Sequence, residues 1–436
     1  MSDPAGSARR DVAIVGGGPG GSTAANFLAA AGRDVVVYER ETFPRFHIGE
    51  SLLPHNMRIF ERLGVVEAMR ARFMEKWGVE FLSSGGDLNR MFHFEEALEP
   101  RYPMCFQTPR AELDALLLEE AKSRGATVRL GATVRAADPE PGGGWSLTVE
   151  ENGAARVERA RILIDASGRD GLLARRNGLR RMDPKARRAA VFAHFTGVPR
   201  RAGRDAGNIV IILLSNGWFW VIPFADGRTS VGVVVDGRAL GEQRATPEQA
   251  LERAIERCPA ARRLLGGATR VSPVYTTSDW SYGARDIAGA DFMMVGDATA
   301  FVDPVFSTGV LLAMSSAEVA ATIVNDALDS GSIPPARRRA YEREVTRHVA
   351  GYHRLVSTFY STAFPRLCFF PESRLRIPEA VLNLLAGDMD PSWRVRWRLA
   401  LFYGLGALYH RFDLGPRVPL LGVFEAADAR ATTGIA

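Results

Sequence analysis

Cysteine is scarce in this sequence of 436 residues. The three cysteines, Cys105, Cys258 and Cys368, are odd in number and form no Cys-x-x-Cys pair. A disulfide framework is therefore excluded, and reduced thiols in a cytoplasmic protein are expected. The seven histidines show no spacing typical of metal ligands, so no metal site is predicted.

Long hydrophobic runs and concentrated charge are missing as well. The late uncharged segment 399–409 is far shorter than the ~20 residues that span a bilayer. Because the first ten residues are polar, we expect no signal peptide. The net charge of +5 comes from arginines scattered among acids, not from a basic stripe. We therefore expect a cytoplasmic protein without a transmembrane segment, which binds no nucleic acid but anionic small molecules or an acidic protein.

Glycine, by contrast, is concentrated in a turn near the N-terminus. The β-branched run 11–15 predicts a buried parallel strand that ends in a G-x-G-x-x-G turn. A helix over 22–31 and a second strand over 35–38 follow. This order is typical of a site where backbone N–H groups hold a pyrophosphate and an acid accepts ribose hydroxyls. The residues predicted to do so are Gly16, Gly18, Gly21 and Glu39.

Three later segments resemble the FAD-dependent aromatic hydroxylase superfamily. Segment 107–114 contains Thr-Pro-Arg-Ala-Glu, and the resemblance implies that Arg110 reaches the cofactor. Segment 292–298 closes on Gly-Asp, which implies that Asp297 holds the ribityl chain of the flavin; segment 162–168 is the third match. The alternative for Arg110 is a surface residue that starts a helix, and the alternative for Asp297 is a helix N-cap. No second glycine fingerprint exists for a nicotinamide nucleotide.

The most distinctive run is Trp-Phe-Trp-Val-Ile-Pro at 218–223. On a strand, Trp218 and Trp220 face the same side. Together with the nucleotide fingerprint, the run resembles the flavin-dependent halogenases, and the resemblance extends from about residue 10 to 330. It implies that the two indoles form a wall between the flavin and the substrate, which prevents direct hydroxylation of the ring. Without the resemblance, such a pair is interpreted as part of the hydrophobic core, because aromatic pairs on strands are usually buried there.

Lys76 lies in the run Phe-Met-Glu-Lys-Trp-Gly, where the resembled family has an essential lysine. In that family, reduced FAD and molecular oxygen give a flavin hydroperoxide, and chloride or bromide attacks it to give hypohalous acid. The resemblance implies that Lys76 delivers this oxidant, either as an ammonium hydrogen-bond donor or as a neutral amine that forms a haloamine. Burial shifts a lysine pKa readily enough for both. The alternative is a solvated surface lysine.

Segment 301–313 predicts a helix that opens at Ser-Thr-Gly. Exposed N–H groups at a helix N-terminus bind anions, and the resemblance implies that Thr308 and Gly309 bind chloride or bromide. A plain N-cap by Ser307 is the alternative. Phe306 stands where halogenases of free tryptophan carry Glu. The chain therefore resembles the branch that acts on phenols and pyrroles, often on carrier proteins.

The predicted fold class is α/β, with a Rossmann-like FAD-binding domain, an interleaved mixed or antiparallel substrate-side sheet and a helical C-terminal region. A charged helix over 336–352 is expected in that region, followed by a basic run, 393–398, that enters the segment 399–409. This tail is a cap over the substrate, a docking face for an acidic carrier protein or an interfacial membrane helix. The predicted divisions are 10–72, 105–185 and 285–330 for FAD, 73–104 and 186–284 for the sheet, and 331–436 for the cap.

The sequence predicts a FAD-dependent halogenase of natural-product or antibiotic biosynthesis. It is expected to install chlorine or bromine on an electron-rich aromatic ring, free or tethered to a carrier protein, with reduced FAD from a partner flavin reductase. A FAD-dependent aromatic hydroxylase is the first alternative. A geranylgeranyl-reductase-like flavoprotein is the second, although its strand motif ends in Phe-Pro where this chain has Ile222-Pro223. A flavoprotein that only senses redox state or scaffolds a complex is the third.

Overall fold

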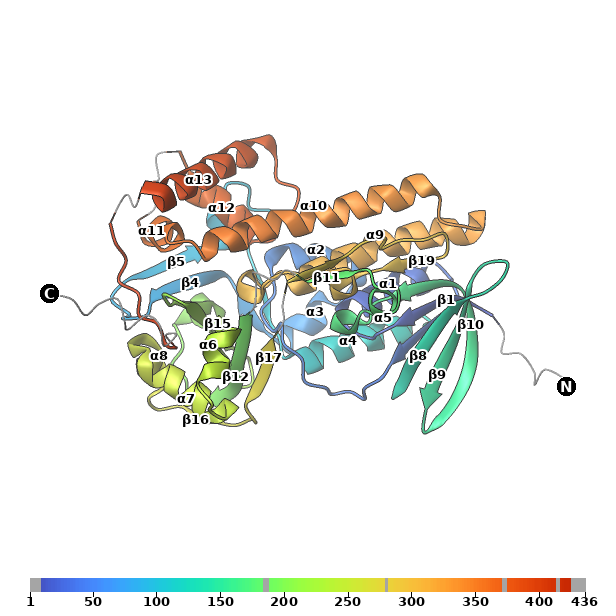
Figure 1. The fold of residues 1–436 in the computed structure, drawn as a ribbon, viewed down its shortest axis with the longest axis horizontal. Coiled ribbons are helices and arrows are strands. Elements are labelled where there is room, and N and C mark those ends of the chain that lie inside the picture. The colour runs from blue at the N-terminus through green and yellow to red at the C-terminus, as the bar shows by residue number, and fades with distance from the viewer. Residues whose placement is uncertain (1–8, 183–187, 279–280, 371–374, 413–415, 425–436) are drawn as a thin grey trace.

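Two large β-sheets lie at opposite ends of the molecule, and long helices connect them (Figure 1). This arrangement confirms the predicted α/β fold class. The expected boundary at 185/186 and the last residues of the expected cap, 425–436, lie outside the described residues. The computed structural model describes residues 9–182, 188–278, 281–370, 375–412 and 416–424.

The first sheet has seven strands in the order β7-β2-β1-β10-β9-β8, with β19 beside β10. Its parallel centre is built from apolar runs that are buried on both faces, as the sequence predicts. The glycine-rich turn leaves the carboxyl end of β1, between β2 and β10, where open α/β sheets bind ligands. The strands are β1 (Arg10–Val15), β2 (Val35–Glu39), β7 (Thr127–Leu130), β8 (Ala132–Pro139), β9 (Trp145–Glu151), β10 (Ala154–Asp165) and β19 (Phe292–Met294).

The second sheet has eight strands in the order β16-β12-β15-β14-β13-β4-β5, with β17 beside β12. The tryptophan strand β14 lies at its centre, and all its residues are buried. Alternation places Trp218 and Trp220 in one core cluster and Phe219 in another, on the opposite face. The strands are β4 (Gly78–Ser83), β5 (Asn89–His93), β12 (Arg188–Thr196), β13 (Ile209–Leu213), β14 (Gly217–Pro223), β15 (Thr229–Asp236), β16 (Thr269–Arg270) and β17 (Tyr275–Ser278).

Two smaller sheets are separate from the large ones. The strand that ends at Lys76 pairs antiparallel with a strand leading to the helix that begins at Arg110. A three-stranded sheet has the order β11-β18-β20. These strands are β3 (Met74–Lys76), β6 (Cys105–Gln107), β11 (Arg180–Met182), β18 (Tyr282–Ala284) and β20 (Ala300–Phe301).

Helix α9 is long and apolar enough to cross a membrane, but 72% of its most apolar window is buried inside the protein. Because it packs against α1, it is a core helix. Helix α10 runs back along the molecule toward the second sheet (Figure 1). The helices are α1 (Pro19–Ala30), α2 (Met57–Leu63), α3 (Val66–Arg70), α4 (Arg110–Ser123), α5 (Leu172–Arg176), α6 (Gly237–Glu242), α7 (Pro247–Arg257), α8 (Pro259–Leu265), α9 (Gly309–Ser330), α10 (Pro335–Phe359), α11 (Ala363–Phe369), α12 (Ile377–Leu385) and α13 (Trp393–Phe412).

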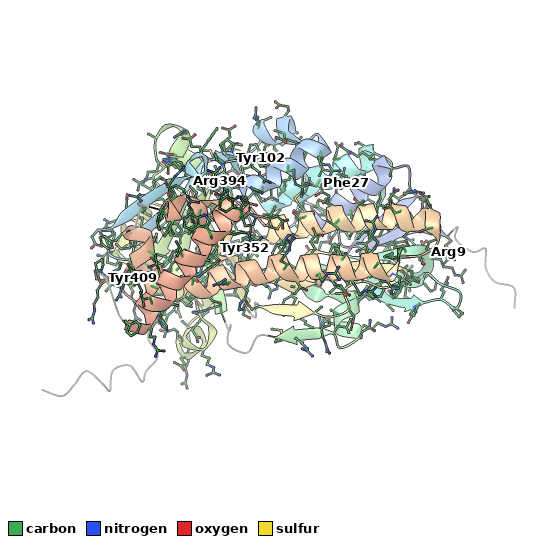
Figure 2. All side chains as sticks on the ribbon, turned by 90° about the horizontal axis from the view of Figure 1, so that it is seen from above. Arg9, Phe27, Tyr102, Tyr352, Arg394 and Tyr409 are labelled. Carbon is green, nitrogen blue, oxygen red and sulfur yellow. The ribbon has the colours of Figure 1, made fainter. Side chains whose placement is uncertain are left out.

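The C-terminal helices cover the tryptophan-bearing face of the second sheet. Phe359 and Phe364 belong to the same buried cluster as the two tryptophans. Seen from above, Arg394 and Tyr409 lie at this end of the molecule (Figure 2). Helix α13 buries Phe402 on one side and exposes 73% of Trp393 on the other. The packing places this tail over the second sheet, and a docking role for its exposed side stays a prediction.

A glycine exchange tests how tightly the first strand and helix are packed. A Cβ on Gly21 would lie 1.9 Å from the carbonyl oxygen of Gly16, whereas a Cβ on Gly351, within α10, meets nothing within 4 Å. We predict that Gly21→Ala lowers the free energy of unfolding by about 1–3 kcal/mol or more. Gly351→Ala raises it by about 0.5–1 kcal/mol. Denaturant unfolding of both variants checks this, and equal effects would contradict the packing.

Candidate active site

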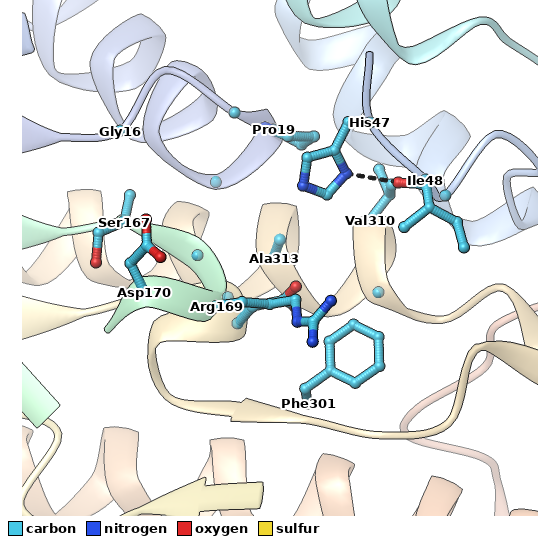
Figure 3. A pocket seen from close by; sticks show the side chains of 18 of the residues that line it. Gly16, Pro19, His47, Ile48, Ser167, Arg169, Asp170, Phe301, Val310 and Ala313 are labelled. Atoms are coloured by element: carbon cyan, nitrogen blue, oxygen red, sulfur yellow. Dashed lines mark hydrogen bonds between the residues drawn. The ribbon is translucent and has the colours of Figure 1, made fainter. Parts of the chain in front are cut away.

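A cavity of about 1320 Å³ lies between the two sheets. It exceeds the size of ordinary small-molecule pockets. Figure 3 shows part of its lining, with the turn at Gly16 and Pro19 facing Arg169 and helix α9. Trp218 and Trp220 line the same cavity. The structure therefore brings the nucleotide fingerprint and the tryptophan strand together, although about 200 residues separate them in the sequence.

The turn after β1 is shaped for a phosphate group. Gly16 has φ +103°, and a Cβ there would lie 2.3 Å from the carbonyl oxygen of Ala166. Helix α1 begins just after Gly18, so its free N–H groups face the cavity that Gly18 lines. The nearest heavy atom to a Cβ on Gly18 is a guanidinium nitrogen of Arg45, at 3.6 Å. A helix N-terminus beside a cation suits the pyrophosphate of a dinucleotide.

Glu39 ends the second strand and lines the cavity. Its Oε2 accepts a hydrogen bond from the N–H of Gly17 at 2.8 Å, and its Oε1 accepts one from Glu41 at 2.9 Å. These two bonds fix the carboxylate and leave lone pairs for ribose hydroxyls.

Arg110 lines the cavity but is engaged by the protein itself. Its Nε and one terminal nitrogen donate to the two carboxylate oxygens of Asp114, each at 2.9 Å. The other terminal nitrogen donates to the carbonyl of Ile48 at 2.7 Å. Arg45 also binds Asp114, at 3.1 Å. Arg110 thus ties the loop after β2 to α4, and Arg45 is a cation at the glycine turn that the sequence reasoning missed.

Asp297 lies in the short 3₁₀ helix η5 (Gly296–Ala298), directly after β19, and lines the cavity. Burial raises the pKa of its carboxyl to about 6, while the charges of Arg110 and Arg169 act in the opposite direction. A partly desolvated carboxyl at a cavity wall is suited to accept hydrogen bonds from hydroxyl groups, such as those of a ribityl chain. Together with the glycine turn and Glu39, the cavity fits FAD.

Lys76 is buried, with 2% of its surface exposed, so it is not a solvated surface lysine. Its Nζ donates to Ser51 Oγ and to the carbonyl of Leu52, each at 2.9 Å. The ring of Phe94 lies 5.4 Å from the same nitrogen. Burial lowers the pKa of Lys76 from 10.5 to about 7. Ser51 lines the cavity, so Lys76 stands directly behind the cavity wall.

In both protonation states, the two hydrogen bonds leave Lys76 either one N–H donor or its lone pair. An ammonium has three N–H donors, and the bonds to Ser51 and Leu52 use two of them. A neutral amine has two N–H donors, which the same bonds use, and its lone pair remains. With a pKa of about 7, both forms are present near neutral pH.

The two tryptophans form a hydrogen-bonded wall. Their ring centroids are 5.7 Å apart. Trp218 Nε1 donates to the hydroxyl of Tyr360, and Trp220 Nε1 donates to Ser230 Oγ, each at 3.0 Å. Buried indole N–H groups need such partners, and these bonds fix the orientation of both rings.

The turn before α9 is held by Asp303. The Oδ1 atom accepts a hydrogen bond from the N–H of Val305 at 3.0 Å and thereby caps the 3₁₀ helix η6 (Pro304–Phe306). Burial raises the pKa of Asp303 to about 6, and the hydrogen bonds that it accepts oppose the rise. The N-cap residue of α9 is Thr308 and not Ser307, which was the alternative from the sequence. The side chain of Thr308 makes no capping hydrogen bond. Gly309 lines the cavity.

A buried pair that sequence reasoning left without a role joins the loop after β2 to the second sheet. Glu50 Oε1 and His194 Nε2 are 2.9 Å apart, and both side chains are buried. The ring of Phe46 is tilted by 60° against that of His194 and stacks on Tyr275 at 4.0 Å between ring centroids. Glu50 and His194 are 144 residues apart, so no local pattern signals their contact.

No group of three or more His, Cys, Asp and Glu residues suited to hold a metal ion occurs in the part of the chain that the structure describes. The cysteines are free thiols, and all three are buried.

A second glycine exchange tests the wall. A Cβ on Gly232, in β15, would lie 2.4 Å from the ring of Trp220 and 2.5 Å from the Cβ of Phe192. We predict that Gly232→Ala displaces the indole and costs about 1–3 kcal/mol of unfolding free energy. Gly283→Ala, on β18, is the control, because a Cβ there meets nothing within 4 Å. Denaturant unfolding of both proteins measures the difference, and a Gly232→Ala protein as stable as its control would refute the crowding.

The lowered pKa of Lys76 predicts a pH-dependent difference between the wild type and Lys76→Met. Below pH 7 the lysine is charged in both states, so the folded state carries the whole desolvation cost. Between pH 7 and 10.5 the folded protein releases this proton and the unfolded chain keeps it. The stability of the wild type relative to the variant therefore rises across this window, by an amount on the order of a few kcal/mol. Urea unfolding at pH 6 and pH 9.5 measures it; a constant difference would disprove the shift.

Comparisons with known proteins agree with this geometry. The FAD binding domain family matches residues 9–354. A pyrrole-2-carbonyl peptidyl-carrier-protein chlorinase of Pseudomonas fluorescens is 32% identical over 404 residues, which cover 87% of this chain and 89% of the chlorinase. A tryptophan 2-halogenase of Chondromyces crocatus is 34% identical over 390 residues, 87% of this chain and 73% of that enzyme.

Among solved structures, CmlS, a flavin-dependent halogenase, superposes with a TM-score of 0.78. It is 32% identical, and the match covers 97% of this chain and 76% of that one. The predicted FAD binding is therefore confirmed, whereas the roles of the individual site residues stay predictions. The chain belongs to the FAD-dependent halogenases, the enzymes that halogenate aromatic rings.

Proposed function

We propose that this halogenase oxidises chloride or bromide in the cavity between the sheets and passes the resulting hypohalous acid to an electron-rich ring through Lys76. The observation that carries the proposal is the placement of the Lys76 amine. It is desolvated and held by Leu52 and by Ser51, which lines the same cavity as the glycine turn and the tryptophans.

The residues at the nucleotide end hold FAD. Bound FAD supplies the oxygen-activating chemistry that oxidises the halide with molecular oxygen. The turn at Gly16, Gly18 and Gly21 gives the pyrophosphate a close approach, and Glu39 accepts ribose hydroxyls. Asp297 accepts hydroxyls of the ribityl chain. Because the sequence contains no second glycine fingerprint, the reduced FAD comes from a separate flavin reductase.

The N-terminus of α9 binds the halide. Gly309 lines the cavity, and Thr308 precedes the first turn of this long helix. The unpaired N–H groups of that turn carry the positive end of the helix dipole, which favours an anion. The Oγ1 of Thr308 is buried and makes no hydrogen bond within the described residues.

Lys76 controls the oxidant. As a neutral amine it reacts with hypohalous acid to give a haloamine and water, so the N–X bond forms while the X–O bond breaks. The ring then takes the halogen and gives its proton to the nitrogen, which restores the amine. As an ammonium, Lys76 instead donates a hydrogen bond to the hypohalous acid. The tryptophan wall keeps the ring away from the flavin in either case.

We further propose a phenol or pyrrole as the substrate, presented on a carrier protein. Phe306, an apolar residue, stands directly before Ser-Thr-Gly and packs on Phe359, with ring centroids 5.5 Å apart. It offers no carboxylate base, so the ring must be reactive by itself. The chlorinase of Pseudomonas fluorescens acts on a pyrrole held by a peptidyl carrier protein, which supports a tethered substrate.

Substitution of Lys76 tests the proposal. Lys76→Met is expected to fold, to bind FAD with the affinity of the wild type and to lose bromination of both resorcinol and a pyrrole-2-carbonyl thioester on a carrier protein. Lys122→Met is the matched control, since Lys122 is exposed and pairs with the exposed Glu119. Mass spectrometry of the products gives the result. A Lys76→Met protein that brominates at the wild-type rate, or a wild type that brominates neither ring, would overturn the proposal.

A further inference from the structure

Three segments that are distant in the sequence meet at one hydroxyl group. The Tyr360 hydroxyl accepts the hydrogen bond from Trp218 Nε1 at 3.0 Å and donates to Asp303 Oδ2 at 2.7 Å. Tyr360 directly follows the last residue of α10, Trp218 lies on the central strand β14, and Asp303 opens the turn before α9. The tyrosine therefore connects the C-terminal region, the indole wall and the turn that leads to Thr308.

The contact is built into the core. Asp303 and Trp218 are 3% and 2% exposed. The guanidinium of Arg188 lies 3.9 Å from the centre of the Tyr360 ring. Burial holds the pKa of the tyrosine well above its ordinary value, so the hydroxyl stays a donor. Loss of this hydroxyl would leave a buried indole N–H and a buried carboxylate oxygen without their partner, which is costly.

The residue before Tyr360 supports the same two partners. The Phe359 ring packs edge-on against Trp218 at 6.4 Å and against Phe306 at 5.5 Å between ring centroids. Phe306 ends the 3₁₀ helix that Asp303 caps. The end of α10 thus touches the wall and the turn twice, once through apolar rings and once through the hydroxyl.

We infer that Tyr360 is a positioning residue for halogenation, which holds the halide-binding turn at a fixed place relative to the tryptophan wall. The inference rests on the proposed halide site at Thr308 and Gly309. Tyr360 acts through Asp303, whose other oxygen fixes the N–H of Val305 and hence the path of the chain into α9. The C-terminal region then covers the second sheet and also positions the halide-binding turn.

Tyr360→Phe tests this role, because it removes the hydroxyl and keeps the ring. The enzyme is loaded with reduced FAD, mixed with oxygen and titrated with bromide, and reoxidation is followed by flavin absorbance. We expect the bromide concentration for half of the maximal effect to rise about tenfold, the cost of one buried charge-assisted hydrogen bond. The rate at saturating bromide should change little.

Two further variants make the test specific. Asp303→Asn keeps an oxygen to cap Val305 and weakens the bond from Tyr360, so it should raise the half-saturating bromide concentration as well. Because both changes act on one bond, the double variant should be no worse than the poorer single one. Tyr403→Phe is the control. Tyr403 also has a guanidinium 3.9 Å over its ring, from Arg354, but lies outside the contact between Trp218 and Asp303.

Unchanged bromide dependence in Tyr360→Phe would overturn the inference and leave the proposed function standing. Equal loss of rate at every bromide concentration would also overturn it, since it would indicate general structural damage. If reoxidation in the wild type does not respond to bromide, the proposed function fails, and the inference fails with it.

Discussion

The free-energy cost of burying the Lys76 amine is the main physical constraint on this site. Lys76 lies behind the cavity wall with its pKa lowered to about 7, and two hydrogen bonds together with the ring of Phe94 compensate in part for the lost water. A lysine in water would be a hydrated ammonium and a poor nucleophile. The fold maintains the buried state by pairing β3 with β6 and by placing Ser51 over the amine. The nitrogen that we propose to carry the halogen is thereby kept next to the cofactor cavity and away from solvent.

The second constraint is that the glycine turn and the tryptophan strand, which belong to different sheets, must line one cavity. The glycine turn belongs to a parallel sheet, and the tryptophan wall belongs to a sheet at the other end of the molecule. Their relative placement is fixed by buried polar contacts such as Glu50 with His194, and by the end of α10 at Tyr360. Such contacts tolerate little displacement, because each partner is costly to leave unpaired. Under the proposed function, the chemistry at the cavity therefore depends on these contacts as well as on the residues that hold FAD.

The parts that local patterns encode were predictable. Strand periodicity placed Trp218 and Trp220 on one face, and the turn chemistry placed Gly16 beside a helix N-terminus. Helix α1 begins at Pro19, before the predicted start, because the first turn of a helix tolerates proline. Contacts between distant residues were not predictable: Tyr360 lies 142 residues from Trp218 and 57 from Asp303, and no spacing signals either bond. The division into domains stays a prediction.

The most direct test of the account needs no aromatic substrate. The wild-type enzyme, carrying anaerobically reduced FAD, is mixed with oxygenated buffer in a stopped-flow spectrometer, with bromide or with nitrate at equal ionic strength. The account predicts that bromide, and not nitrate, accelerates the return of oxidised-flavin absorbance, with saturation as the halide site fills. Identical traces in bromide and nitrate would contradict it, because halide would then play no part in the chemistry of the cavity.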